Sequence, residues 1–375
     1  MKKRIRLGIL FGGRSGEHEI SLESAASIMK ALDPAKYEVV PIGITREGRW
    51  LAGPEAIGKG PEESMRRVLE SGNPVTASVD PAGPQLIPLN CQPSSHRTGL
   101  TKVDVIFPVL HGTFGEDGTV QGLLELAGIP YVGAGVLGSA AGMDKDVMKR
   151  LFRDAGLPVA KWLLVLRNEW QENPARIRRA IVKEIGYPLF VKPANLGSSV
   201  GITKVHRVPA LDAAIETAAR YDRKILAEKA VNGREIECSV LGNDRPQASV
   251  PGEVIPVNEF YDYEAKYLKM GSELVIPARL TRTQTRKVQD YAVRAFRAVD
   301  CAGMARVDML LDRKTGKIYV NEINTIPGFT SISMYPKLWE ASGVAYSDLI
   351  DRLVELALER HQEKTKTTYS YGNPR

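Results

Sequence analysis

The segment most informative about the fold is Ala305-Arg-Val-Asp-Met-Leu-Leu-Asp-Arg-Lys-Thr-Gly-Lys-Ile-Tyr-Val-Asn-Glu-Ile-Asn-Thr-Ile-Pro-Gly328. Apolar side chains from Val307 to Leu311 alternate with Arg306 and Asp308, which is the period of a β-strand with two different faces. Residues 312–316 are typical of a turn, and residues 318–324 form a second alternating run. The segment therefore predicts a β-hairpin.

The register of this hairpin decides which side chains meet. If a five-residue loop closes it, Arg306 lies opposite Glu322 and Asp308 opposite Val320. Asp308, Glu322 and Asn324 then project from one face, with Glu322 the diagonal neighbour of Asp308 at roughly 7–8 Å between backbones. Two carboxylates that close repel each other, so we expect a cation between them. Oxygen ligands with no His or Cys nearby favour Mg²⁺ or Mn²⁺, an ion that usually shares its shell with nucleotide phosphates; the alternative is a surface hairpin with solvated charges.

The composition is that of an ordinary globular protein of two or three domains, with 375 residues, 43% of them apolar and 25% charged. No run of about 18 apolar residues is present, so no membrane span is predicted. The N-terminus is basic and then apolar, like a signal peptide, but the apolar run is short and enters Gly12-Gly13 without a small-residue cleavage site, which favours a first β-strand. The three cysteines, Cys91, Cys238 and Cys301, are odd in number and widely spaced, which fits a reducing cytoplasm.

The net charge of +7 comes from Lys and Arg residues that are dispersed along the chain rather than clustered with aromatic residues. This pattern argues against nucleic-acid binding. It suits anionic substrates such as ATP.

The N-terminal region has the order strand, loop, helix, strand. Residues 4–11 and 37–44 are the strands, and a helix begins near Ser21. This order predicts a parallel sheet with a ligand site at the carboxyl ends of its strands. Glu17 lies in the turn after the first strand and is a candidate ligand contact, although an acid there commonly serves only the helix dipole. His111 follows a buried strand at residues 103–110 and heads a glycine-rich loop, so it is a second candidate, although a lone histidine there is more commonly structural.

Two glycine motifs are set aside. Residues 52–99 are rich in Gly, Pro and Ser and predict a loop insertion with one short helix. Within it, Gly53-Pro-Glu-Ala-Ile-Gly-Lys-Gly60 is close to a P-loop, but Gly60 replaces the Ser or Thr that would reach Mg²⁺. Gly133-Ala-Gly-Val-Leu-Gly138 follows a predicted strand at residues 129–132, but no acid closes a second strand about 20 residues later, as a dinucleotide site requires.

Two further segments suggest a phosphate site and a lid. Residues 187–202 predict a strand, a Gly197-Ser198-Ser199 turn and another strand, and such a turn exposes N–H groups and hydroxyls to phosphate oxygens. Lys192 adds a positive charge beside it. Residues 260–267 place four aromatic residues and Lys266 in a segment without clean periodicity, which indicates either core filling or a lid, with the lid favoured.

Seven segments follow one another in a fixed order: Gly12-Gly13-x-Ser-Gly-Glu17-His-Glu-Ile-Ser21, His111-Gly-x-x-Gly-Glu116-Asp-Gly-Thr, Gly142-Met-Asp-Lys145, Val191-Lys192-Pro with Gly197-Ser198-Ser199-Val-Gly201, Tyr261-Asp-Tyr-Glu-Ala-Lys266-Tyr267, Ala305-Arg306-Val-Asp308, and Asn321-Glu322-Ile-Asn324-Thr-x-Pro-Gly328. Together they resemble the ATP-grasp superfamily and, within it, the D-alanine–D-alanine ligase family. The resemblance runs from Arg4 to about His361. It implies an α/β fold of the three-domain ATP-grasp type with an N-terminal Rossmann-like parallel-sheet domain. The implied domains are residues 1–140, 141–237 and 238–362, followed by a flexible tail at 363–375.

The resemblance also implies a role for particular residues. The implied ATP contacts are Lys145, Lys192, Gly197, Ser198, Ser199, Glu228, Lys229, Val231 and Glu235. The implied ligands of Mg²⁺ or Mn²⁺, with two ions per site, are Asp308, Glu322 and Asn324. The implied amino-acid contacts are Glu17 and His111 for the first D-alanine, and Ser333 and the amide of Met334 for the second. The implied catalytic set is Glu17, Ser198, Lys266, Tyr267, Arg306 and Gly328, with Arg306 and the Gly328 amide stabilising an oxyanion.

The implied reaction joins two D-alanines through an acyl phosphate, consumes ATP, and serves peptidoglycan precursor synthesis. Tyr267 lies in a segment that the D-alanine–D-lactate ligases lack, which favours a dipeptide product. The alternatives are a D-alanine–D-lactate or D-alanine–D-serine ligase, a non-catalytic ATP-grasp nucleotide-binding protein, and a basic nucleic-acid binder. The resemblance further implies a cytoplasmic homodimer that binds neither membrane nor nucleic acid.

Overall fold

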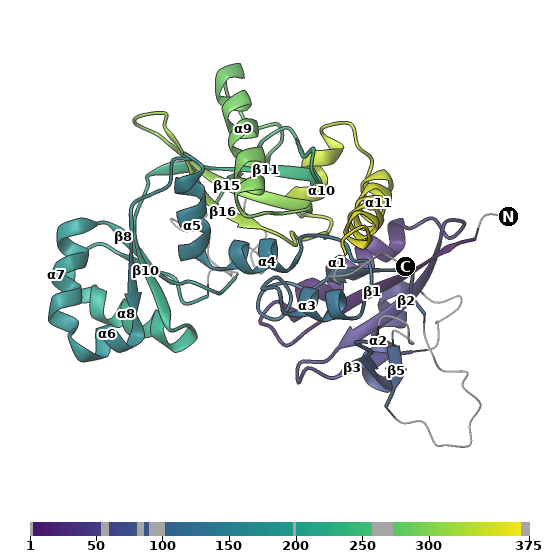
Figure 1. Ribbon diagram of the computed structural model, residues 1–375. Helices are drawn as coiled ribbons and strands as arrows, with labels where there is room; N and C mark the ends of the chain where they lie inside the picture. Colours follow the sequence, from purple (N-terminus) through teal and green to yellow (C-terminus); the bar gives the residue numbers. More distant parts are fainter. Residues whose placement is uncertain are drawn as a thin grey trace.

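A computed structural model describes residues 3–53, 60–80, 86–89, 102–197, 200–256 and 273–368 of the chain. Figure 1 shows three β-sheets in succession, with the N-terminal sheet at one end, the sheet containing β8 and β10 at the other, and the sheet containing β11, β15 and β16 between them. The expected α/β fold with an N-terminal sheet of parallel strands is confirmed.

The N-terminal sheet has the strand order β5-β4-β3-β2-β1-β6. Its parallel part consists of β1 (Ile5–Gly12), β2 (Tyr37–Ile44) and β6 (Val105–Val109). These strands are nearly continuous apolar runs because helices cover them, among them α1 (His18–Ala31) and α2 (Pro61–Ser71). Helix α3 (Thr119–Leu126) follows β6.

The prediction for residues 52–99 was wrong in part. The described residues of this region contain the expected helix, α2, but also two short strands that extend the sheet beyond β3 (Trp50–Ala52), namely β4 (Asn73–Ala77) and β5 (Leu86–Pro88). Strands this short, each carrying a proline, give almost no alternation to detect. The strand predicted at residues 129–132 is reduced to a single bridge between Ile106 and Tyr131.

The second sheet is antiparallel, with the order β7-β10-β8-β9. Its strands are β7 (Trp162–Leu166), β8 (Leu189–Pro193), β9 (Thr203–Val205) and β10 (Lys224–Lys229). Its helices are α6 (Arg167–Glu172), α7 (Pro174–Glu184) and α8 (Leu211–Tyr221), with a short 3-10 turn at Val208–Ala210. Apolar residues of these helices and strands form a core of their own.

The third sheet has the order β14-β13-β11-β15-β16, with β12 (Gln247–Ala248) paired to β11. Its long strands are β11 (Gly233–Gly242), β15 (Gly303–Asp312) and β16 (Ile318–Asn324), and the shorter ones are β13 (Gly252–Ile255) and β14 (Glu273–Val275). Helices α5 (Lys145–Asp154) and α9 (Arg282–Ala298) pack against it, and α4 (Val136–Met143) precedes α5. After the hairpin come α10 (Met334–Glu340) and α11 (Tyr346–Thr365).

The predicted hairpin is confirmed as β15 and β16, but its predicted register was wrong. Asp308 lies opposite Glu322, and Arg306 lies opposite Asn324. Two features cause the difference. The loop has four residues rather than five, because the amide of Asp312 donates to the carbonyl of Lys317 at 2.9 Å. A β-bulge then falls between Asp308 and Met309, which brings the polar residues of both strands onto one face.

Phe329 joins the N-terminal sheet to the segment that follows the hairpin. Its ring is fully buried and packs edge-on against Phe107 of β6, with centroids 5.7 Å apart. Its amide donates to Ser24 Oγ of α1 at 3.1 Å, and its carbonyl accepts from the hydroxyl of Tyr346 at 2.9 Å. Helix α11 lies beside this junction, and its apolar residues share the same core (Figure 1).

Among the described helices, none combines the length and the apolar character needed to cross a membrane. Cys238 and Cys301 are buried free thiols, and burial raises the pKa of each to about 12. Cys91 lies outside the described residues.

Candidate active site

The polar face of the hairpin holds a compact charged group. Nε of Arg306 lies 2.7 Å from Oδ1 of Asp308, and Nη2 lies 2.7 Å from Oδ2. Nδ2 of Asn324 donates to Oδ2 of Asp308 at 3.0 Å. Glu322 is the cross-strand neighbour of Asp308. The structure therefore brings together the four hairpin residues that the sequence pointed to, closer than the diagonal placement that was expected.

Glu237 completes this group and was missed at the level of sequence. It lies on β11 opposite Asp308, and its Oε2 is 3.0 Å from Nε of Arg306. Burial opposes the charge of Arg306, but Asp308 and Glu237 outweigh it and raise the pKa of the guanidinium. The available signal was the alternation of Glu235 and Glu237 with buried residues at 236 and 238, which places both acids on the face that β11 shares with the hairpin.

Lys145 connects this group to the loop ending at Gly197, which was predicted to bind phosphate. It is the first residue of α5, and its Nζ donates to the carbonyl of Leu196 at 2.9 Å and lies 3.9 Å from Oε2 of Glu322. Asp144 caps the helix by accepting from two of its backbone amides. The cap fixes the start of α5, and with it the ammonium of Lys145, against the loop that leads to Gly197.

A buried triad joins β10 and β8 of the second sheet to helix α5. The carboxylate of Glu228 on β10 pairs with Lys149 at 2.9 Å and with Lys192 at 2.6 Å. Burial opposes ionisation of Glu228, but the two ammonium groups prevail and lower its pKa. Burial lowers the pKa of Lys149. Lys192 was predicted from sequence, whereas Lys149 was not, because a lysine in an amphipathic helix usually faces solvent.

On the N-terminal side, Glu17 lies against two loops. A Cβ placed on Gly112 or Gly197 would be 2.6 or 2.7 Å from its Oε2, so both loops approach this carboxylate through a glycine. Glu17 is the N-cap residue of α1, but its side chain makes no capping hydrogen bond. The capping role is therefore not what places the Glu17 side chain.

His111 and Glu116 fasten the loop after β6 to the end of the hairpin. Nδ1 of His111 lies 3.0 Å from the carbonyl of Ile326, and its Nε2 lies 3.4 Å from Ser24 Oγ. Burial lowers the pKa of His111. Glu116, missed as a site residue although it lies in a quoted motif, accepts from the amides of Gly112 at 2.7 Å and Ile326 at 3.1 Å. Burial, and then the negative charge of Glu17, raise the pKa of Glu116 to about 8.

The segment after the hairpin places Gly328 beside Ser333. A Cβ on Gly328 would lie 2.8 Å from Ser333 Oγ, so only glycine fits without displacing that hydroxyl. Ser333 Oγ accepts from the amide of Thr330 at 3.0 Å. The side chain of Met334 is buried in a small apolar cluster, which leaves its backbone as the part available to a ligand.

The remaining predicted residues divide into two groups. Around the end of β10, the amide of Lys229 donates to the carbonyl of Lys161, and the carbonyl of Val231 accepts from Gly233. Glu235 lies on β11, in the same register as Leu310 of β15. The predicted site residues that lie outside the described part of the chain are Ser198, Ser199, Lys266 and Tyr267.

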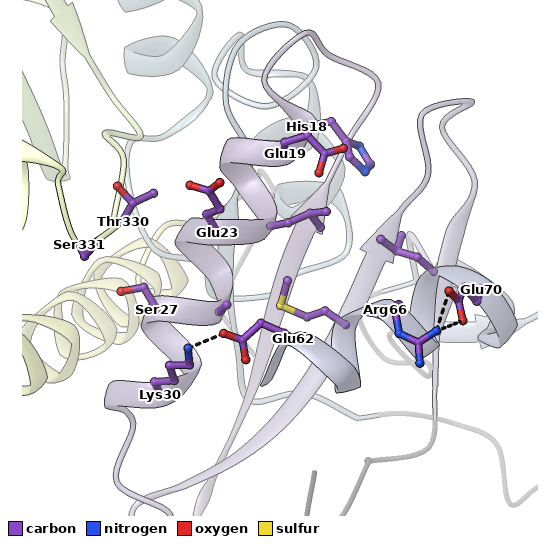
Figure 2. Close-up of a pocket in the computed structure, with 14 residues that line it drawn as sticks. His18, Glu19, Glu23, Ser27, Lys30, Glu62, Arg66, Glu70, Thr330 and Ser331 are labelled. Atoms are coloured by element: carbon purple, nitrogen blue, oxygen red, sulfur yellow. Dashed lines mark hydrogen bonds and ion pairs between the residues drawn. The ribbon is translucent and has the colours of Figure 1, made fainter. Parts of the chain in front are cut away.

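A cavity of about 710 Å³ lies between α1 and α2, and Figure 2 shows its lining. Its walls include Leu22, Met65 and Leu69, with charged side chains such as Glu23 and Arg66 around them. It contains none of the predicted site residues, although its lining residues His18 and Thr330 are close in sequence to Glu17 and Gly328. No reaction chemistry is assigned to it.

The oxygen-lined hairpin face, the buried lysines and the three sheets are the features of an ATP-grasp protein, and comparisons with known proteins agree. A family model described as "D-ala D-ala ligase N-terminus" matches residues 6–134, and one described as "D-ala D-ala ligase C-terminus" matches residues 151–355. The chain belongs to the D-alanine–D-alanine ligase family.

Relatives match along nearly the whole chain. A D-alanine–D-alanine ligase of Natranaerobius thermophilus is 50% identical over 370 residues, covering 99% of each chain, and one of Chloroherpeton thalassium is 53% identical over 365 residues, covering 97% and 98%. Among solved structures, the D-alanine–D-alanine ligase from Coxiella burnetii superposes with a TM-score of 0.83 at 40% identity, covering 97% of this chain and 96% of that one. The VanG D-Ala:D-Ser ligase from Enterococcus faecalis also gives 0.83, at 37% identity and coverage of 95% and 100%.

Proposed function

We propose that this chain is an ATP-dependent D-alanine–D-alanine ligase that supplies the dipeptide for peptidoglycan precursors. A carboxylate oxygen of the first D-alanine attacks the γ-phosphorus of ATP, and ADP leaves as an acyl phosphate forms. The amine of the second D-alanine then attacks the acyl carbon, loses a proton, and displaces inorganic phosphate. The observation that carries the proposal is the group of Arg306, Asp308, Glu322 and Asn324 on one hairpin face, in a chain of this family.

The phosphates of ATP are assigned to the space beside Lys145 and the loop ending at Gly197. The ammonium of Lys145 lies between that loop and Glu322, so it can neutralise phosphate charge without moving far. Lys192 is held nearby by Glu228. We place the hydroxyls and amides of Ser198 and Ser199 on the same phosphates. In this step the protein supplies position and opposite charge rather than covalent chemistry.

Adenine and ribose are assigned to the end of β10 and the start of β11. We propose that the backbone from Lys229 to Val231 meets the base, and that Glu235 meets the ribose. Glu228 belongs to this end of the site as well, but its carboxylate already binds two ammonium groups. Its part in ATP binding is therefore to keep Lys149 and Lys192 in place.

The donor set of the hairpin fits a hard divalent ion. Asp308 and Glu322 face each other on paired strands, and the amide group of Asn324 lies 3.0 Å from Asp308. We propose that these three hold Mg²⁺ or Mn²⁺, two ions per site, with Asn324 turning its oxygen inward. When bound, such ions neutralise the charge that develops on the phosphate oxygens. Arg306 contacts both oxygens of Asp308 and shares Oδ2 with Asn324, so the ion and the guanidinium would draw on the same carboxylate.

Arg306 and the amide of Gly328 are assigned to the oxyanion of the second step. A preorganised cationic donor is most effective where negative charge develops in the transition state and water is excluded. Arg306 is buried and fixed by two carboxylates, so it need not reorganise during the reaction. A protein that only senses nucleotide has no use for this donor, which disfavours the non-catalytic alternative.

The two amino acids are assigned to different parts of the chain. The first is placed beside the loops after β1 and β6, and the second beside the 328–334 segment. Glu17 is proposed to bind the ammonium of the first D-alanine, with His111 beside its carboxylate. Ser333 and the amide of Met334 are proposed to hold the carboxylate of the second. Lys266 and Tyr267 are proposed to close over the site from the 260–267 segment and exclude water, with Lys266 reaching the phosphoryl group.

D-serine is the second candidate for the second substrate, because a D-Ala:D-Ser ligase superposes as well as the D-alanine–D-alanine ligase of Coxiella burnetii. The test is phosphate release from ATP with D-alanine alone, and with D-alanine plus D-serine or D-lactate, together with identification of the product. We expect D-alanine alone to support turnover and D-alanyl-D-alanine to be the main product. A main product containing D-serine or D-lactate would show that the chain is a D-alanine–D-serine or D-alanine–D-lactate ligase instead. ATP binding without phosphate release under any condition would show that the chain is a non-catalytic nucleotide-binding protein.

We also propose a homodimer in the cytoplasm. The compartment is where ATP is available, and the buried thiols of Cys238 and Cys301 are compatible with it. Light scattering of the full chain is the check on the assembly, and a monomeric mass at working concentration would contradict it.

A further inference from the structure

Glu237 is a buried carboxylate that contacts Arg306 but belongs to none of the proposed metal, ATP or amino-acid contacts. It lies on β11 opposite Asp308 of β15, and Asp308 lies opposite Glu322 of β16. Its side chain is only 7% exposed, and its Oε2 lies 3.0 Å from Nε of Arg306. Three carboxylates therefore form a row across three adjacent strands, and the guanidinium of Arg306 contacts the first two.

Arg306 carries one positive charge but contacts two carboxylates, those of Asp308 and Glu237. Its Nε lies 2.7 Å from Asp308 and 3.0 Å from Glu237, and its Nη2 lies 2.7 Å from Asp308. A planar guanidinium is already oriented by one bidentate carboxylate. A second buried carboxylate adds a desolvation cost, so its presence calls for a purpose beyond pairing.

Asp308 is also a proposed ligand of the divalent ion, and this second role explains why Arg306 needs another carboxylate. Under the proposed function, its oxygens also serve a divalent ion, and a carboxylate that gives charge to a metal ion holds an arginine less tightly. Its Oδ2 is already shared between Arg306 and Asn324. If Asp308 alone held Arg306, the guanidinium would lose its anchor when nucleotide and ion bind, which is when the oxyanion donor is needed.

We propose that Glu237 is a positioning residue that holds the guanidinium of Arg306 in place while Asp308 serves the divalent ion. This inference rests on the proposed function. Glu237 touches no substrate atom, and it acts through Arg306. Its removal affects the attack of the second amine more than phosphoryl transfer, because Arg306 is assigned to the oxyanion of the second step.

Separating the two steps tests this directly. With ATP and D-alanine, hydroxylamine traps the acyl phosphate as a hydroxamate, so acyl-phosphate and dipeptide formation are measured in one reaction. Glu237→Gln removes the charge and keeps the shape. We expect dipeptide formation to fall by roughly tenfold or more, while formation of acyl phosphate, counted as hydroxamate plus dipeptide, changes by less than about threefold. An equal loss in both steps, or no loss in either, overturns the proposal.

A matched control is Glu253→Gln on β13 of the same sheet. Glu253 is similarly buried, with 8% of its side chain exposed, and pairs with Arg234 at 2.6 Å, away from the hairpin face. We expect both of its rates to stay within about threefold of the unmodified chain. If Glu237→Gln fails to fold, Glu237→Asp takes its place, because it keeps the charge but withdraws it from Arg306. The same selective loss is expected, and its absence counts against the proposal.

A second readout does not depend on turnover. In the chain labelled with ¹⁵N-arginine, the Nε–H signal of Arg306 is assigned by its disappearance in Arg306→Lys. After addition of Mg²⁺ and ADP, we expect this signal to stay sharp in the unmodified chain and to broaden or move toward free arginine in Glu237→Gln. An unchanged signal in the variant overturns the proposal. Failure of the unmodified chain to release phosphate with D-alanine is a separate outcome, which overturns the proposed function. The spectrum still shows whether Glu237 holds Arg306 in place.

Discussion

At the scale of single residues, Asp308 is the side chain on which most of the site depends. One of its neighbours is a guanidinium and another is an amide, and a second carboxylate faces it across the strand pair. A lone aspartate on a strand says little, but its spacing from Arg306 and the polar run at 321–324 were enough to predict that these groups share one face, although not which residues pair across the strands. Glu237 escaped prediction because it reaches Arg306 from a strand about 70 positions earlier in the chain, and only sheet topology reveals that contact.

Arg306→Ala is expected to reduce dipeptide formation by roughly a hundredfold or more, because it removes the charged donor assigned to the oxyanion. The rate of D-alanyl-D-alanine formation is the measurement. Arg66→Ala is the control, since Arg66 is an exposed residue of α2 that, among the described residues, forms ion pairs with Glu63 and Glu70 of its own helix. Activity of Arg306→Ala equal to that of the control would contradict the role given to Arg306.

Glu116 is expected to make stability depend on pH. Its pKa is about 8 in the folded chain and is taken as 4.5 when unfolded, so between these values the folded state holds a proton that the unfolded state has lost. Stability from this group is therefore fully present below about pH 4.5 and is lost as pH rises toward about 8. Glu116→Gln removes this titration.

The measurement is the difference in Tm between Glu116→Gln and the unmodified chain at pH 5 and pH 9. We expect the variant to gain relative stability at pH 9. Glu172→Gln, on the exposed surface of α6, is the control for a lost carboxyl group. A Tm difference that is the same at both pH values would show that Glu116 does not titrate as described.

At the scale of elements, the hairpin shows what alternation can and cannot predict. The alternation of apolar residues predicted both strands of the hairpin, because a strand with one buried face carries an apolar side chain at every second residue. The register failed because turn length and bulge are set by local hydrogen bonds: Oδ1 of Asp312 accepts from the amides of Lys314 and Thr315, and Gly316 takes a φ of 66°. Nothing in the composition of residues 318–324 marks Asn321 as the residue that a bulge would leave unpaired.

Helix α5 and strand β10 make the next prediction. Lys149 is fully buried, and its ammonium binds Glu228 and the carbonyl of Asn321. Lys149→Met leaves a buried carboxylate with one partner fewer, and we expect it to lower the free energy of unfolding by about 3–5 kcal/mol. Urea denaturation measures this. Lys183→Met, at an exposed position of α7, should change it by less than about 0.5 kcal/mol, and a similarly small change for Lys149→Met would contradict the triad's structural role.

At the scale of the whole molecule, the site is assembled from three sheets rather than built on one. Glu17 and His111 come from loops that follow β1 and β6 of the N-terminal sheet, Lys192 from the second sheet, and Arg306 and Asp308 from the third. Sequence motifs predicted most of these residues one by one. They did not predict the ties between sheets, such as Glu116 to Ile326 or Ser24 to Phe329, because each tie involves a backbone group, which any residue supplies.

Phe329 tests the importance of these ties. Its ring packs against Phe107, Tyr335 and Tyr346, so truncation opens a cavity between the N-terminal sheet and the segment carrying Gly328 and Ser333. Phe329→Ala is expected to lower the free energy of unfolding by about 3–5 kcal/mol. Urea denaturation is again the measurement, with the exposed Leu137→Ala as control. A loss no larger than that of the control would show that the junction does not stabilise the fold.

The coupling of ATP cleavage to formation of a D-alanyl-D-alanine bond at the hairpin face is the property on which the proposed function depends. Its most direct test is to measure ADP, phosphate and dipeptide together in a reaction containing ATP, Mg²⁺ and D-alanine, for the unmodified chain and for the double variant Asp308→Asn, Glu322→Gln. We expect one ADP, one phosphate and one D-alanyl-D-alanine per ATP consumed by the unmodified chain, and none of the three above background from the variant. Phosphate without dipeptide in the unmodified chain, or full coupled activity in the double variant, would show that the hairpin face does not couple the two reactions.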